Sequence, residues 1–213
     1  MRALRWISFM VVLAGLAWRF PLFHVVPLQQ AVAEKKAATF DPTQFAGTFW
    51  TNRLLASLDK AVSATVLLPA IQSDPAAAKK QFARSVGMGE SYFYFVAGKG
   101  RVVSVSDDEI LLAVTATGTN ADISLPAGPV FGNALRDSTS LLNVSDYPNS
   151  QDFNDISAAL NHLVETTVLP TLRVQAKVGA QLSFAGCAEV ADESSDLKPL
   201  HVVPVMTRLL PNL

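Results

Sequence analysis

The pattern of hydrophobic and polar positions changes along the chain from helical spacing to strand-like runs near residue 89. Before that point, Asp41-Pro42 and Asp74-Pro75 each combine a capping side chain with a proline at the first helical position, which is typical of a helix start. Apolar residues recur at helical spacing as far as about Ala64, and the Ala-rich stretch after the second start is expected to end at Gly87. The sequence therefore predicts two helices ahead of the strands.

Short runs rich in aromatic and β-branched residues follow, and they predict five strands with one helix among them. Three strands form a meander joined by tight turns, then comes the helix, and two strands close the series. Within the last strand Pro204 indicates an edge or a bulge, because proline donates no hydrogen bond to a neighbouring strand. The expected elements are strands over 92–105, 110–116 and 121–125, a helix over 150–169 that Pro170 ends, and strands over 180–190 and 200–209.

The order of these elements is that of an OB-type barrel, although other small barrels have the same number of strands. The fold class is therefore predicted to be α+β: a five-stranded OB-like small β-barrel with a helix between strands 3 and 4, preceded by two helices and an N-terminal membrane anchor. The expected divisions are a signal anchor or signal peptide over 1–30, a linker over 31–39, a helical N-terminal part over 40–89 and the barrel over 90–210.

The N-terminal segment has the layout of an export signal, with Arg2 and Arg5 ahead of an apolar run that begins at Trp6. An uncleaved signal anchor is the preferred interpretation, because the run reaches Leu28 and a helix of that length could span a hydrocarbon layer of about 30 Å. Cleavage is the alternative, since Ala31-Val32-Ala33 supplies a small-residue pattern. The predicted location is the inner membrane, with the bulk of the chain in the periplasm.

Composition and charge exclude several classes of protein. Half of the residues are hydrophobic and 16% are charged, which is too apolar for a disordered chain. The net charge of −1 and the acidic stretch over 191–198 argue against nucleic acid as a partner. Cys187 is the single cysteine, so an intramolecular disulfide is impossible, and three scattered histidines give no metal-ligand spacing. No metal or other cofactor is expected.

Candidate chemistry is sparse, and the chain is predicted not to be an enzyme, because it contains no catalytic sequence signature. The most unusual stretch runs from Gly128 to Asp137, where Arg136 could offer a planar fork of donors to a carboxylate or a sugar hydroxyl. Amides and acids also line one face of the long helix. The candidate solute-binding residues are Arg136, Asp137, Asn154, Asp155 and Asn161. In the ordinary interpretation, Arg136 pairs with a neighbouring acid and the helix face is simply solvated.

Four segments carry a likeness to a known family: Gly98–Val105, Gly128–Asp137, Phe153–Asn161 and Gly179–Gly186. Over about 40–205 the chain resembles the bacterial predicted periplasmic lipoproteins catalogued as a domain of unknown function. The resemblance implies an accessory role outside the inner membrane, since genes of this family often lie beside sugar ABC-transporter genes. It brings no catalytic residues. This chain departs from the family in lacking the lipobox cysteine, and an uncleaved anchor would tether it instead.

The leading hypothesis is a non-enzymatic accessory or binding module, tethered to the membrane and facing the periplasm. Its expected partners are a transporter or another protein, and a small solute such as a sugar. One alternative is a structural scaffold of a membrane protein complex, which would show an exposed apolar patch. Another is a hydrolase assembled from dispersed residues, for which Asp137, Asp155 and His162 are the candidates.

Overall fold

The computed structural model describes residue 6 and residues 40–86, 89–114, 118, 120–147 and 150–211. Apart from Trp6, the expected anchor and the alternative cleavage site lie outside these residues. Among the residues described, no helix is long and apolar enough to cross a membrane. Residues 41–213 form one compact unit that is distinct from residues 1–40. The helical part and the barrel therefore belong to the same unit.

The first predicted helix begins where expected and ends early. The Asp41 carboxylate accepts hydrogen bonds from the backbone amides of Thr43 and Gln44 at 2.9 and 3.0 Å, and so caps the helix. The helix ends at Lys60 rather than near Ala64, because Ala61 is extended and leads into a two-residue strand. Its consecutive parts are α3 (Pro42–Phe49), η1 (Trp50–Leu54) and η2 (Leu55–Lys60).

A further helix, α4 (Ala64–Ser73), fills the interval between the two predicted ones. The strand β1 (Val62–Ser63) separates it from η2 by pairing in parallel with the barrel. The next helix, α5 (Pro75–Phe82), starts as predicted, with the Asp74 carboxylate accepting from the Ala77 amide at 3.0 Å. It stops short of Gly87, since Arg84 and Ser85 form the strand β2.

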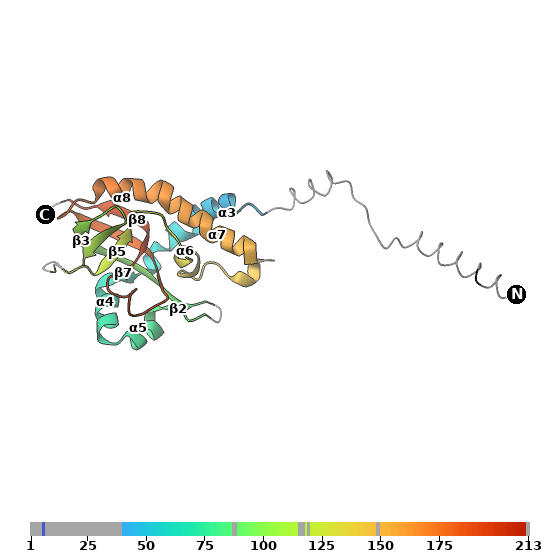
Figure 1. Ribbon diagram of the computed structural model, residues 1–213, viewed down its shortest axis with the longest axis horizontal. Helices are drawn as coiled ribbons and strands as arrows, with labels where there is room; N and C mark the ends of the chain where they lie inside the picture. Colours follow the sequence, from blue (N-terminus) through green and yellow to red (C-terminus); the bar gives the residue numbers. More distant parts are fainter. Residues whose placement is uncertain are drawn as a thin grey trace. The chain divides into compact units, whose positions relative to one another are not determined.

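The centre of the barrel is one long strand, β3 (Tyr92–Val105), which pairs with a long strand on each side. Its first ten residues, Tyr92–Arg101, pair with β6 (Gln181–Val190). Its last part, from Arg101 to Val105, pairs with β4 (Glu109–Ala113), with a register shift between Val102 and Ser104. Next to β4 lies β5 (Ile123–Pro126). The final segment of the barrel pairs with β5 through β7 (Leu200–His201) and with β6 through β8 (Val203–Leu209). Because this segment joins both ends of the sheet, the sheet curls on itself (Figure 1).

The fold class is α+β as predicted, but the number of strands differs from five. In the part of the chain that the structure describes, the sheet has eight strands. Two of them, β1 and β2, are short additions to β3. The last predicted strand is divided into β7 and β8 by Val202, whose amide donates to the Ser124 carbonyl at 2.8 Å.

The bulge that Pro204 indicates is present. The register between β6 and β8 shifts between Ala185 and Gly186, where Gly186 lies opposite Pro204. Glycine is required at this point, because a Cβ atom on residue 186 would collide with the backbone carbonyl of Val203.

The helix between β5 and β6 does not end at Pro170. It runs through α7 (Ser150–Leu163), the wide turns of η4 (Val164–Val168) and α8 (Leu169–Gln175). Pro170 lies in the first turn of α8, directly after the wide turns of η4, where the hydrogen-bonding pattern of the helix changes. In Figure 1, α7 and α8 lie above the sheet, while α4 and α5 lie below it.

The core fills the barrel with aromatic and branched aliphatic side chains. Tyr94, Leu112, Ile123 and Phe184 are at most 1% exposed. All four residues of β5 are buried, so neither face of this strand is open to solvent. A ligand must therefore be sought at the loops and helices around the barrel.

Candidate functional site

The loop that joins β5 to the next helical turn, over residues 127–133, is fixed in place by three polar side chains. Glu165 accepts a hydrogen bond from the Val130 amide at 2.8 Å, and Glu189 accepts one from the Asn133 amide at 2.9 Å. The side-chain amide of Asn161 donates to the Gly132 carbonyl at 3.1 Å. Gly132 itself has a φ of +87°, a conformation that strongly favours glycine. The loop is thus held in a single conformation.

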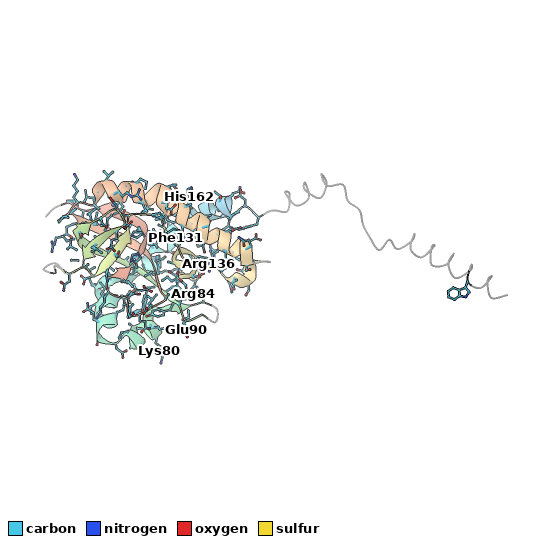
Figure 2. The ribbon with its side chains drawn as sticks, viewed as in Figure 1. Lys80, Arg84, Glu90, Phe131, Arg136 and His162 are labelled. Carbon is cyan, nitrogen blue, oxygen red and sulfur yellow. The ribbon has the colours of Figure 1, made fainter. Side chains whose placement is uncertain are left out.

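Arg136 lies just beyond this loop, in α6 (Ala134–Asp137), and its side chain is buried (Figure 2). Its Nε and Nη2 atoms donate to the two carboxylate oxygens of Asp137, each at 2.8 Å. Nη1 donates to the Phe153 carbonyl and to the Asn154 side-chain oxygen, each at 3.2 Å. Its guanidinium carbon is 3.9 Å from the centroid of the Phe153 ring. Four of the five N–H groups of this guanidinium are therefore used within the protein.

The structure joins three of the five candidate solute-binding residues by hydrogen bonds, and a fourth, Asn161, bonds to the adjoining loop. Asp137 is occupied by Arg136, Asn154 accepts from Arg136, and Asn161 holds the loop. Asp155 is separate, because its carboxylate accepts from the Gln151 side chain at 2.7 Å. Together these four residues, which we name the α6–α7 network, fasten α6 and the preceding loop to α7, and this matches the ordinary interpretation of Arg136. Solute binding by these residues stays a prediction.

The candidate hydrolase residues do not form a relay among the hydrogen bonds of the described chain. His162 is exposed, and its Nδ1 atom lies 3.7 Å from Glu165. Asp137 and Asp155 bond to Arg136 and Gln151, as described above. Among the described residues, no group of three or more His, Cys, Asp and Glu side chains is placed to hold a metal ion.

Sequence reasoning missed Glu165 and Glu189, which fix the loop together with Asn161. Each bonds to a backbone amide 35 or 56 residues away, so no local pattern marks them. Ser157 was missed for the same reason, since its hydroxyl donates to the Asn133 side chain 24 residues earlier. Only the tertiary fold brings these partners together.

The conformation of the loop between β6 and β7, residues 191–199, is stabilised by hydrogen bonds to its own acidic side chains. The Asp196 carboxylate accepts from the amides of Ala191 and Asp192 at 2.9 and 2.8 Å. Burial raises the pKa of Asp196, but these hydrogen bonds and one from Ser195 outweigh it, so the pKa lies below its usual range. The hydroxyl and amide of Ser194 likewise lower the pKa of Asp192. The acids are therefore charged at neutral pH and serve to shape the loop.

This loop borders a hollow of about 260 Å³ against α4, which we name the α4 hollow. Its wall includes the buried side chains of Leu68, Ile71 and Leu197. Three polar side chains at its edge, those of Gln72, Asn120 and Lys198, have no hydrogen bond or ion pair with any described residue. The remaining lining residues are Ala121 and Asp122, and the Asp122 carboxylate is held by the Val114 amide at 2.8 Å.

In two other hollows, most of the polar side chains are already engaged. In one of about 430 Å³, Lys79 lies 3.9 Å from Glu193 and 4.1 Å from the centroid of the Tyr92 ring. The Tyr92 hydroxyl also donates to Glu193 at 3.0 Å. In the other, of about 390 Å³, Arg173 donates to the Ala127 carbonyl at 2.6 Å. Of these three hollows, the α4 hollow offers the largest share of free polar groups over an apolar wall, and it is the candidate site.

Comparisons with known proteins bear on the family and on the fold. A family model described as "Predicted periplasmic lipoprotein (DUF2291)" matches residues 9–207. The crystal structure of an OB-fold protein from Thermotoga maritima is similar, with a TM-score of 0.72 and 24% sequence identity over 81% of this chain and 99% of that chain. At that identity the likeness shows the fold alone, and it confirms the OB-type fold. No curated protein matches the chain.

Proposed function

Because the chain belongs to the family of predicted periplasmic lipoproteins, we propose that it is a non-catalytic binding module on the periplasmic side of the inner membrane. Its ligand in this proposal is a small polyhydroxylated solute such as a sugar, and its role is accessory to a solute transporter. Membership of the family assigns the bulk of the chain to the outside of the cytoplasm, in association with a membrane. The inner membrane, the transporter and the solute are parts of the proposal.

The α4 hollow is the observation that carries the proposal. A sugar presents hydroxyl groups that both donate and accept, and the amides of Gln72 and Asn120 can do the same in return. Its C–H face can lie on Leu68 and Ile71. The volume of about 260 Å³ is below the about 300–1,000 Å³ of pockets for drug-sized ligands, which favours a smaller molecule.

The tether in this proposal is the apolar N-terminal segment rather than a lipid. Cys187 is the single cysteine of the sequence, and it is fully buried in β6. Burial also raises the pKa of its thiol to about 12, although the Ser138 hydroxyl opposes this shift. A lipid cannot be attached at such a position in the folded protein, because the thiol is neither accessible nor ionised.

A thermal-shift titration of the full-length protein in detergent tests the proposal. The panel contains monosaccharides, disaccharides and polyols, and a ligand at about 100 times its dissociation constant should stabilise the protein by about 2.7 kcal/mol. We expect Gln72→Ala and Asn120→Ala to abolish the shift. Gln81→Ala is the matched control, since Gln81 is an exposed glutamine on the adjacent helix α5 that does not line the hollow. A saturable shift that survives both hollow variants, or a flat response across the panel, would contradict the proposal.

A further inference from the structure

The most exposed large apolar side chain of the described residues is Phe131, which is 81% accessible to solvent. It lies in the held loop over residues 127–133, between the two backbone amides that Glu165 and Glu189 bind. Figure 2 labels Phe131 between His162 and Arg136 in the view. An aromatic side chain buries about 150–250 Å² when it is covered, and aromatic rings dominate the energetics of interfaces, so a ring on a fixed loop can anchor a contact.

The backbone on both sides of Phe131 is fixed, so the ring is presented from a set position. The amide of the preceding residue bonds to Glu165, and the carbonyl of the following residue, Gly132, bonds to Asn161. Gly132 also packs tightly, because a Cβ atom there would lie 2.8 Å from a Glu189 carboxylate oxygen. A contact residue on such a loop loses little conformational freedom when it is buried by a partner.

The charges around Phe131 are negative. Among the described residues, neither Glu165 nor Glu189 has a lysine or arginine within 4.0 Å, and the nearest basic side chain to Glu165 is that of His162, whose Nδ1 atom lies 3.7 Å away. An acidic rim repels a bilayer of anionic lipids and also repels a second copy of itself. It attracts lysine and arginine, which can also lie over the face of an aromatic ring.

We propose that the Phe131 loop is a docking surface for a second protein, whose own surface combines an apolar pocket for the phenyl ring with lysine or arginine side chains at the edge of that pocket. Phe131 is the anchor of this contact, and the Glu165 and Glu189 carboxylates select the partner by charge. This surface is separate from the α4 hollow, with which it shares no lining residue. Docking at Phe131 can therefore be tested independently of solute binding.

Photo-crosslinking in the cells that make the protein tests this proposal. The full-length chain carries p-benzoylphenylalanine at position 131 in one variant and at position 178 in the control. Val178 is also exposed, at 69%, but Lys177 precedes it and no carboxylate flanks it. The site of attachment on the partner is then sequenced by mass spectrometry.

The expected result is a protein adduct from position 131 only, attached to a partner peptide that contains lysine or arginine next to apolar residues. A doublet of the protein's own mass, an adduct to lipid alone, the same adduct from both positions, or no adduct from position 131 would each overturn the proposal. An adduct whose partner surface is acidic would overturn the part played by charge.

Two sets of variants separate the anchor from the charges once the partner protein is purified. Phe131→Ala should weaken binding at least about 30-fold, as for an interface hot spot, and leave the melting temperature unchanged because the ring makes few contacts. The double variant Glu165→Gln, Glu189→Gln keeps an amide oxygen to accept from each loop amide but removes both charges. It should weaken binding and remove its salt dependence. Equal affinity of either variant and the original protein would overturn the proposal.

Discussion

At the scale of single residues, Arg136 shows how a side chain that suggests a ligand site can serve the fold. Its carboxylate partner is the next residue in the chain, so their pairing could be inferred from sequence. The carbonyl of Phe153 and the oxygen of Asn154 could not, because α7 has to be placed against α6 before they meet. The result is a buried, hydrogen-bonded ion pair that fastens the loop before α7.

Removing one member of this pair should destabilise the protein strongly. In Arg136→Ala, Asp137 would keep a buried charge with no cation, and breaking such a pair costs about 3–5 kcal/mol. Urea unfolding of the two proteins measures the difference. Lys177→Ala, which alters an exposed cation, is the control and should change stability by less than about 0.5 kcal/mol. An Arg136→Ala protein as stable as the original would refute the structural role of Arg136.

Two buried acids of the barrel predict a loss of stability in alkali. Burial raises the pKa of the Cys187 thiol from 9.0 to about 12, and it raises the pKa of Tyr94 from 10.0 to about 12 against the opposing effect of the Tyr92 hydroxyl. Both groups hold their protons more tightly in the folded state. Their contribution to the free energy of unfolding is therefore complete below the pKa values of the unfolded state, and it is lost as the pH rises from about 9 toward 12.

Urea unfolding at pH 7, 9, 10 and 11 checks this prediction. The free energy of unfolding should be constant to about pH 9 and then fall, by up to about 1.4 kcal/mol per pH unit for each group that titrates. Cys187→Ala should reduce the slope above pH 9, whatever it does to the stability at pH 7. A stability that is unchanged between pH 9 and 11 would show that these groups are not buried as described.

At the scale of elements, local signals placed the starts of helices well and their ends poorly. Asp41 and Asp74 act on amides within three residues, so their capping roles follow from sequence alone. The end of the first helix depends instead on β1, where Val62 pairs with Val96 of β3. That pairing is tertiary, and α4, which follows it, lies in an interval where the sequence predicted no helix. The predicted helix end at Pro170 was wrong for a related reason, because the wide turns of η4 allow the helix to continue beyond this proline.

Two Gly→Ala changes should have opposite effects on stability, because one lies at the bulge between β6 and β8 and the other lies at an open position in a helix. Gly186→Ala places a Cβ atom against the Val203 carbonyl, a backbone group that cannot move aside, and should cost at least about 1–3 kcal/mol. Gly47→Ala lies in α3, where nothing is within 4 Å of the new atom, and should stabilise the helix by about 0.5–1 kcal/mol. Thermal unfolding of both variants measures the two signs. A harmless Gly186→Ala would contradict the register between these strands.

At the scale of the whole molecule, the order of strands and helix was enough to predict an OB-type fold, because the connections between strands restrict how a small sheet can close. The candidate site could not be obtained in the same way. The α4 hollow needs Gln72 from α4, Asn120 from the turn before β5 and Lys198 from the loop after β6. These residues are far apart in sequence, and α4 itself was not predicted. A search of sequence for clustered polar residues found the α6–α7 network instead, which is engaged within the protein.

The proposed function requires that a small solute binds at the α4 hollow and not at the α6–α7 network. The most direct test is amide NMR of residues 41–213, the compact unit, during titration with the solute that gives the largest thermal shift. We expect saturable chemical-shift changes at Leu68, Gln72, Asn120, Asp122 and Lys198, with little change from Gly128 to Asp137. Changes centred on Arg136, Asn154 and Asn161 would instead show that the α6–α7 network is the ligand site, and would contradict binding at the α4 hollow.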